Sequence, residues 1–292
     1  MHLFLQEQAV HPPKLIIIEG IPGSGKTSTA QNAADWLRGQ GREARLFLEG
    51  DVNHPADFES VACLEADAFR DLLGRFPDQQ TGLAAQAQAG PDGRVLIRFG
   101  RLDNPPEALR SILSAQDVYN LPEADFMAVT LARWQDFAAA AAREEAVYVF
   151  ECCLLQNQLT TLMAVHDTPP ERSQTQMAQI GRAIAPLNPL VIYLEPPSLR
   201  AALERVAGER PAAWLAFVTA YTAGQAWGQH RGLSGKAGMI AFYEARRDLE
   251  KEIFAGLFPG GLWIEQAGAD WGATTARVQE CLAGAFGRGN SL

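Results

Sequence analysis

Residues 20–27, with the sequence GIPGSGKT, combine three glycines with a lysine and a hydroxyl side chain. They match the pattern G-x-x-x-x-G-K-[ST], in which backbone N–H groups surround phosphate oxygens. In this pattern Lys26 reaches the β- and γ-phosphates, and the hydroxyl of Thr27 contacts Mg²⁺. We therefore predict a site for a nucleoside triphosphate. The residues predicted to bind the nucleotide here are Pro22, Gly23, Ser24, Gly25, Lys26, Thr27 and Ser28.

The segments on both sides of this loop are those that phosphate binding requires. Residues 15–19, LIIIE, are typical of a buried parallel strand. Residues 28–37 contain neither proline nor glycine and predict a helix, which Gly39 and Gly41 end. The alternative is a glycine-rich turn that binds nothing. A loop between a strand and a helix, however, directs N–H groups and the positive end of the helix toward an anion.

Four further apolar runs predict strands, and helical patterns separate them. The predicted strands are residues 44–49, 146–151, 190–195 and 261–265, and the predicted helices include residues 122–145, 174–185 and 273–285. Strands that alternate with helices predict the α/β class, with a mostly parallel five-stranded sheet covered by helices on both faces.

Three of these strands end in a carboxylate, at Glu49, Glu151 and Glu195. Ligands of such sheets bind at the carboxyl ends of the strands. Glu151 is predicted to hold Mg²⁺ through water or to contact the substrate, and Asn157 to bind a polar substrate. The alternative for Glu151 is a buried structural carboxylate with a partner.

Asp51 follows the second predicted strand within the sequence LEGDVNH. A carboxylate at this position can orient an attacking hydroxyl and accept its proton, so we predict a catalytic role. His54 lies close enough in sequence to touch the same acceptor. The alternative for Asp51 is the N-cap of a helix predicted over residues 55–73.

The long interval between the second and third strands, residues 52–145, is predicted to be an insertion in one domain that spans residues 1–292. We expect helices there, a loose segment over residues 77–93 and a short strand over residues 94–99. The insertion is interpreted as a lid over the acceptor, with a separately folding domain as the alternative. Arg98 and Arg101 are candidate ligands of an anionic acceptor, although a solvated strand edge explains them equally well.

Two segments carry a resemblance to small-molecule kinases with a phosphate-binding loop. The LEGD segment that ends in Asp51 resembles the Asp-Gly-Asp strand end of adenylylsulfate kinases, whose last carboxylate faces the acceptor hydroxyl. Residues 190–211, with residues 242–247 and the last strand, look like thymidylate and shikimate kinases. The resemblance implies a three-layer kinase-like fold and a lid within residues 196–258. It covers about half of the chain and excludes the insertion.

The same resemblance implies roles for two arginines and one late segment. Arg205 would pack near the base of the nucleotide, and Arg210 would be a catalytic residue that neutralises charge on the transferring phosphate. Residues 266–271 occupy the place where these families hold adenine. The chain departs from thymidylate kinases because Cys152 follows Glu151 where those enzymes have Asp-Arg, and because their Arg-Glu-Pro-like turn is missing.

Composition and charge argue against several classes of protein. The net charge is −9 and no basic run is present, which argues against nucleic-acid binding. The four cysteines have no metal-ligand spacing, and free thiols fit a reducing cytosol. The first ten residues lack the features of a signal peptide, and no apolar run is long enough to span a membrane. We expect a cytoplasmic protein of open oligomeric state.

These observations together predict a kinase that depends on ATP and Mg²⁺ and transfers the γ-phosphoryl group to a hydroxyl of a small polar molecule. Within the same class, the alternative is a nucleoside or nucleotide kinase. From a different class, the alternative is a nucleotide-binding switch or ATPase that acts on a protein partner. The long insertion and Asp51 favour a kinase, because a switch needs no pocket for an acceptor.

Overall fold

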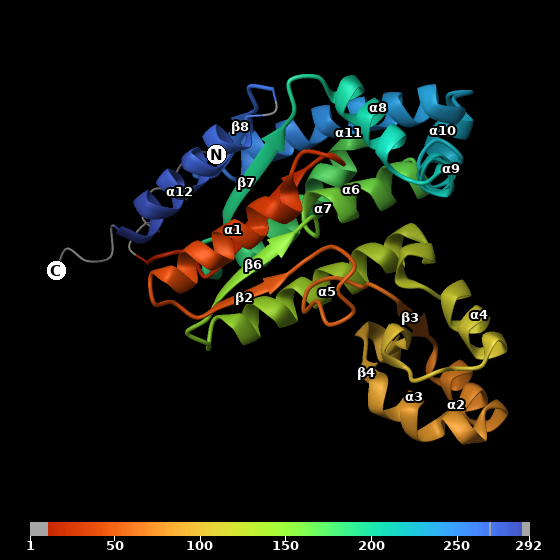
Figure 1. Cartoon of the computed structure of the whole chain (residues 1–292). Helices are drawn as coiled ribbons and strands as arrows, with labels where there is room; N and C mark the ends of the chain where they lie inside the picture. Colours follow the sequence, from red (N-terminus) through yellow and green to blue (C-terminus); the bar gives the residue numbers. More distant parts are fainter. Residues whose placement is uncertain (1–10, 269, 288–292) are drawn as a thin grey trace. The chain divides into compact units, whose positions relative to one another are not determined.

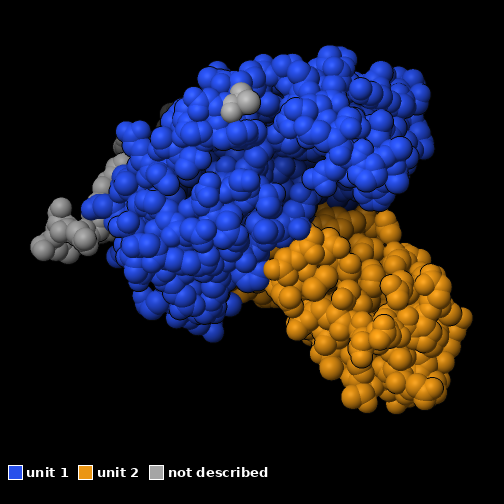
Figure 2. Space-filling model, in the orientation of Figure 1, with its two compact units in different colours: residues 1–49, 138–292 blue, residues 50–137 orange. Residues whose placement is uncertain are grey.

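A computed structural model describes residues 11–268 and 270–287 of the chain. The described chain divides into two compact units, which Figure 2 shows in different colours. The core unit combines the described residues up to Glu49 with those from Ala138 onward, and the inserted unit is Gly50–Phe137. The predicted insertion, residues 52–145, thus corresponds closely to the second unit. Its function as a lid remains a prediction.

The core unit contains a five-stranded sheet in the order β2-β6-β1-β7-β8. All four pairings between neighbouring strands are parallel. The strands are β1 (Leu15–Gly20), β2 (Ala44–Phe47), β6 (Val147–Glu151), β7 (Leu190–Glu195) and β8 (Leu262–Glu265). This arrangement confirms the predicted α/β class and parallel sheet, and it is consistent with a P-loop-like fold.

Helices cover both faces of this sheet (Figure 1). On one face, Ile16 and Ile18 of β1 pack with Ala30 and Leu37 of α1 (Lys26–Gly39) and with Leu282 of α12 (Trp271–Gly287). On the other face lie α6 (Leu155–Thr160), α7 (Pro170–Ile184) and α11 (Gly235–Leu257), and α11 packs against both of the others. The alternating apolar residues of the strands fill the two interfaces, as expected for a sheet buried on both sides.

Helices connect the strands of the core unit and follow the last one. They are α1 (Lys26–Gly39), α6 (Leu155–Thr160) continued by a π-helical turn (Thr161–Val165), α7 (Pro170–Ile184), a 3₁₀ turn (Ala185–Leu187), α8 (Leu199–Glu209), α9 (Ala212–Tyr221), α10 (Ala226–His230), α11 (Gly235–Leu257) and α12 (Trp271–Gly287). The predicted helices over residues 28–37, 174–185 and 273–285 correspond to α1, α7 and α12.

The inserted unit has a small antiparallel sheet in the order β3-β5-β4 and its own apolar core. Ala62 and Ile97 of this sheet pack with Leu109 and Leu113 of α4. Its elements are β3 (Val61–Leu64), α2 (Ala66–Arg75), α3 (Gln80–Gln86), β4 (Ala87–Ala89), β5 (Val95–Arg98), α4 (Glu107–Ala115) and α5 (Glu123–Ala141), with 3₁₀ turns at Pro77–Gln79, Pro91–Gly93, Phe99–Arg101 and Val118–Asn120.

The prediction of one continuous helix over residues 55–73 is wrong. Ser60 adopts a positive φ of 53°, and Val61–Leu64 then pairs with β5 as a strand, so the helix begins only at Ala66. Tertiary pairing therefore overrides the local helical pattern. The segment predicted to be loose, residues 77–93, contains α3 and β4, whereas the short strand over residues 94–99 is confirmed as β5.

No helix among residues 11–268 and 270–287 is both long enough and apolar enough to cross a membrane.

Candidate functional site

The loop between β1 and α1 has the backbone conformation of a tight glycine turn. Gly23 and Gly25 have φ angles of 81° and 86°, which residues with a side chain rarely adopt. A Cβ atom at Gly25 would lie 2.4 Å from the ring of Trp271, and one at Gly23 would lie 2.4 Å from Val206. Both glycines are therefore required by conformation and by space. Helix α1 begins directly after Gly25, so its free N–H groups face the loop.

Lys26 lies at the first position of α1 and is only 6% exposed. Its Nζ donates a hydrogen bond to the carbonyl of Ile21 at 3.0 Å, inside the loop. Burial disfavours the charged ammonium, but the nearby carboxylates of Glu49 and Glu151 favour it, and the pKa of Lys26 is raised above its ordinary value. The lysine is thus held as a cation beside the loop.

Thr27 and Glu151 lie together at the carboxyl edge of the sheet. The Oγ1 atom of Thr27 donates a hydrogen bond to Oε1 of Glu151 at 2.6 Å. Candidate ligand atoms of Glu49, Glu151 and Cys152 lie within 4.8 Å of one another. Burial raises the pKa of the Cys152 thiol well above its ordinary value, so this group remains protonated. The hydroxyl and the two carboxylates are oxygen donors, which fit Mg²⁺ better than a thiophilic metal.

A cavity of about 460 Å³ opens beside this loop in the core unit. Among the predicted site residues, those that line it are Pro22, Gly23, Gly25, Lys26, Thr27, Ser28, Glu151, Asn157, Arg205 and Arg210. Ser24, also a residue of this loop, is fully buried and does not line the cavity. The cavity therefore brings together the loop, the predicted metal ligands and both arginines that the kinase resemblance pointed to.

A second cavity of about 330 Å³ shares Gly23, Arg205 and Trp271 with the first. Its remaining walls include Pro196 and Pro197 after β7. Arg205 donates a hydrogen bond to the carbonyl of Gly23 at 2.9 Å, so it crosses from α8 to the loop. The segment predicted to hold adenine, residues 266–271, contributes Gln266, Gly268 and Trp271 to this cavity, while Ala269 lies outside the described residues.

A buried carboxylate joins the loop strand to helix α6. Glu19 is fully buried, and its two oxygens accept hydrogen bonds from the amides of Leu154, Leu155 and Gln156 at 2.9, 2.8 and 3.1 Å. Desolvation by burial, with the charge of Glu250, raises the pKa of Glu19 to about 7, against the effect of these three N–H donors. Glu19 thereby fixes the start of α6 next to the loop.

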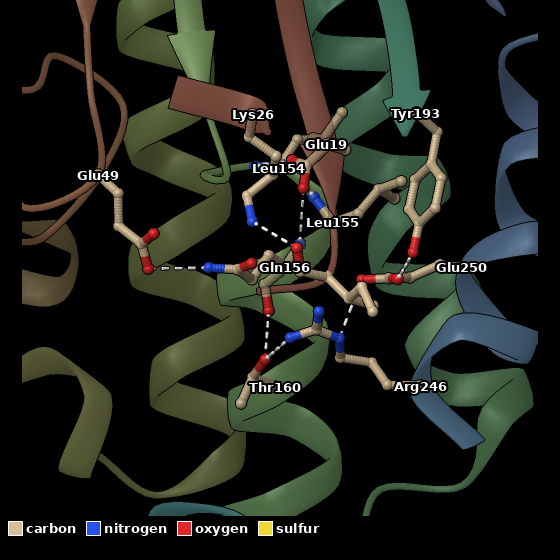
Figure 3. Close-up of polar contacts among 11 residues, drawn as sticks. Glu19, Lys26, Glu49, Leu154, Leu155, Gln156, Thr160, Tyr193, Arg246 and Glu250 are labelled. Carbon is tan, nitrogen blue, oxygen red and sulfur yellow. Dashed lines mark hydrogen bonds and ion pairs between the residues drawn. The ribbon is translucent and has the colours of Figure 1, made fainter. Parts of the chain in front are cut away.

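Residues of α6 contact both Glu49 of the first cavity and a buried arginine (Figure 3). Nε2 of Gln156 donates to Glu49 at 2.9 Å, and the hydroxyl of Thr160 donates to the carbonyl of Gln156 at 2.6 Å. Nη1 of Arg246, from α11, donates to that hydroxyl at 2.7 Å. Arg246 and Glu250 are 1% and 0% exposed, and their Nε and Oε1 atoms are 3.1 Å apart.

Of the three carboxylates at strand ends, Glu49 and Glu151 line the first cavity and Glu195 does not. Glu195 forms an ion pair with Arg247 at 2.9 Å and accepts a hydrogen bond from the indole of Trp263 at 2.8 Å. It is therefore a structural residue that joins β7 to β8 and α11.

Four predicted site residues belong to the inserted unit: Asp51, His54, Arg98 and Arg101. The Oδ1 atom of Asp51 accepts a hydrogen bond from the amide of Asn53 at 2.8 Å. Because no helix begins at residue 55, the alternative role of Asp51 as the cap of that helix is wrong; its side chain forms an Asx turn instead. Asp51 as the acceptor-positioning group stays a prediction.

His54 and Arg98 have structural contacts in the inserted unit, whereas Arg101 is exposed. His54 is 1% exposed, and its Nδ1 accepts hydrogen bonds from the amides of Ala56 and Asp57 at 3.1 and 2.9 Å. Burial lowers the pKa of His54 to about 4, which keeps Nδ1 free of a proton. Nη1 of Arg98, 8% exposed, donates to the carbonyl of Val52 at 3.1 Å. The solvated alternative for Arg98 is wrong because this side chain is buried, while its predicted role as an acceptor ligand stays a prediction.

Several residues of the first cavity carried no predicted role. They are Glu49, Gln156, Thr160, Tyr243 and Arg246, with Trp214, Phe217 and Tyr221 of α9. The sequence indicated that Glu49 could belong to the site, because this residue ends a predicted strand. Gln156 and Thr160 are four residues apart in the segment after Glu151, which places the two on one helical face. Arg246 and the α9 aromatics lie more than 50 residues further along the chain than Thr160, and only the fold brings them to the loop.

No protein-family model matches the chain. The chain is 25% identical over 117 residues to the signal recognition particle protein of Mycoplasma pneumoniae, and the match covers 38% of this chain and 26% of that protein. The chain therefore spans about a quarter of the length of this relative. The similarity agrees with the coarse assignment that loop and sheet support, a P-loop type of nucleotide-binding protein.

Proposed function

We propose that the protein is a phosphotransferase that uses a nucleoside triphosphate and Mg²⁺ to phosphorylate a small polar molecule. The observation that carries this proposal is the extent of the 460 Å³ cavity. It begins at the phosphate-binding loop and continues past Lys26 to polar side chains of α6 and α11, among them Asn157 and Thr160. This arrangement offers room for a second substrate beside the γ-phosphate. ATP is our proposed nucleotide, on the resemblance to small-molecule kinases.

The proposed roles follow from position and charge. Lys26, held as a cation, binds the β- and γ-phosphates. Thr27 and Glu151 hold Mg²⁺, which when bound neutralises charge on those phosphates. Arg205 on α8 and Arg210 after it line the same cavity, where a guanidinium can bind phosphate oxygens through two donors. Trp271 and the two prolines of the second cavity provide an apolar place for the base.

Glu49 is our proposed group for orienting the acceptor hydroxyl. It lines the same cavity as Lys26 and Glu151, and its Oε1 is fixed by Nε2 of Gln156. A carboxylate at this position can accept the proton of an attacking hydroxyl. Asp51, two residues further on, is the competing candidate for this role.

A second candidate function is a nucleotide-binding switch or hydrolase that acts on a protein partner. The similarity to a signal recognition particle protein favours it, although that match covers only a quarter of the relative. Such a protein would hydrolyse the nucleotide without a small acceptor.

The two functions differ in where the γ-phosphate goes. Incubation with γ-³²P-labelled ATP or GTP, with and without pooled sugars, nucleosides and amino alcohols, distinguishes them. We expect label in an organic phosphate that appears only with the pool. Label in inorganic phosphate alone, at a rate that the pool does not change, would instead support the switch or hydrolase.

A further inference from the structure

Arg246 is a buried arginine in the wall of the first cavity. It lies on α11, is 1% exposed and lines the cavity together with Lys26, Asn157 and Thr160. An arginine this deeply buried normally uses its donors, because a desolvated charge with unmade hydrogen bonds is destabilising.

The partners of Arg246 account for only part of its donor capacity. Nη1 bonds to Thr160, and Nε faces Oε1 of Glu250 at 3.1 Å. Nη2 is buried and has no hydrogen-bond partner among the described residues. The other oxygen of Glu250, Oε2, accepts a hydrogen bond from the hydroxyl of Tyr193 at 2.6 Å, whereas Oε1 and Nε of Arg246 form an ion pair without a hydrogen bond. Arg246, a residue that lines the cavity, therefore keeps a buried donor, Nη2, without a hydrogen-bond partner.

Carboxylates also line the cavity. Oε1 of Glu49 accepts from Gln156, and Oε1 of Glu151 accepts from Thr27. Along α6, Gln156 contacts Glu49 and Thr160, one turn later, contacts Arg246 (Figure 3). Glu49 and Arg246 thus contact side chains one turn apart on α6. Glu209, the third carboxylate in the wall, is paired with Arg205 at 3.3 Å.

We propose that the second substrate carries an anionic group, a phosphate or a carboxylate, and that Arg246 binds this group through its free Nη2. The proposal rests on the proposed function and names the chemical class of its acceptor. The acceptor is then a hydroxyl compound with one negative group, oriented so that its hydroxyl lies toward Glu49 and the loop. Anionic acceptors bind well to arginine because its planar fork matches phosphate and carboxylate oxygens.

The test uses the whole protein with its nucleotide site filled. The protein is saturated with Mg²⁺ and the non-hydrolysable β,γ-imido analogue of ATP, and inorganic phosphate or acetate is then titrated at constant ionic strength. The midpoint of thermal unfolding reports binding, since a ligand that binds the folded state raises it. We expect phosphate, acetate or both to raise the midpoint more than chloride does, and the more effective anion identifies the group on the acceptor.

Two variants and one control tie this shift to Arg246. Arg246→Met combined with Glu250→Gln removes both buried charges and retains similar volumes, so the remaining carboxylate is not left unpaired. Arg246→Lys keeps the charge without the fork and serves if the double variant does not fold. Arg200→Met is the matched control, because Arg200 is exposed and does not line the cavity. We expect the anion affinity to fall about tenfold or more in both Arg246 variants and to stay unchanged in the control.

The outcomes separate this inference from the proposed function. Failure of the wild-type protein to bind the nucleotide analogue would contradict the proposed function. Binding of the analogue without any effect of phosphate or acetate would overturn the anionic acceptor alone. An anion-dependent shift that persists in the Arg246 variants would also overturn it, because the anion would then bind elsewhere.

Discussion

Glu49 and Asp51 are two carboxylates on either side of Gly50, and they compete for one chemical role. Glu49 lines the cavity that Lys26 also lines, and we expect Glu49→Gln to lower phosphorylation of the acceptor by about 10²–10⁴. Asp51→Asn is the matched comparison, since Asn retains the oxygen that accepts the amide of Asn53. Turnover and nucleotide affinity of the two variants are measured side by side. Full turnover in Glu49→Gln, with a large loss in Asp51→Asn, would assign the role to Asp51.

The lowered pKa of His54 predicts that the free energy of unfolding depends on pH. Its pKa is about 4 in the folded chain and 6.5 as the ordinary value, so the unfolded state takes up a proton first as the pH falls. The contribution of His54 to the free energy of unfolding is fully present above pH 6.5. As the pH falls to 4, the free energy of unfolding decreases by roughly 3 kcal/mol. His54→Asn keeps a side-chain acceptor for the amides of Ala56 and Asp57 but does not titrate. The difference in unfolding free energy between the two proteins, from denaturant titrations, should change with pH in that window; a constant difference would show that His54 does not titrate as described.

At the scale of elements, the loop and α1 depend on Trp271 as well as on glycine. Gly25→Ala introduces a Cβ at a φ of 86° and 2.4 Å from the Trp271 ring, so we expect the loop to distort and nucleotide affinity to fall about tenfold or more. Trp271→Leu in the same chain should restore part of the loss, because it removes the steric part and leaves the backbone strain. Gly39→Ala is the control, since that position has no neighbour within 4 Å. Calorimetry measures the affinities, and equal affinity in Gly25→Ala and wild type would refute the close packing of the loop.

The elements that sequence patterns predicted well are those fixed by local signals. The apolar run before the loop, the loop itself and α1 are contiguous, and each has its own signature. The region after Asp51 was predicted incorrectly because Val61–Leu64 becomes a strand only through pairing with β5 more than 30 residues away. Within the site, Arg246 has an ordinary helical context in the sequence. Its burial beside Thr160 follows from the packing of α11 on α6, which no local pattern records.

At the scale of the whole molecule, the described chain contains two compact units, and the first cavity is lined by the core unit alone. The glycine-rich loop, the proposed metal ligands and the arginine proposed to bind an anion thus belong to one unit. The sequence carried enough information to predict a nucleotide site at this loop. The acceptor end could not be predicted, because α6, α9 and α11 meet at the loop only after folding.

The central claim is that this loop binds a Mg²⁺-nucleoside triphosphate through Lys26. Calorimetric titration of the whole protein with Mg²⁺ and ATP or GTP tests it, with Lys26→Met to keep the buried stem and Lys236→Met as an exposed lysine control. We predict one bound nucleotide per chain in the wild type, affinity about a hundredfold lower in Lys26→Met, and unchanged affinity in Lys236→Met. Absence of binding in the wild type, or equal affinity in Lys26→Met, would contradict the account.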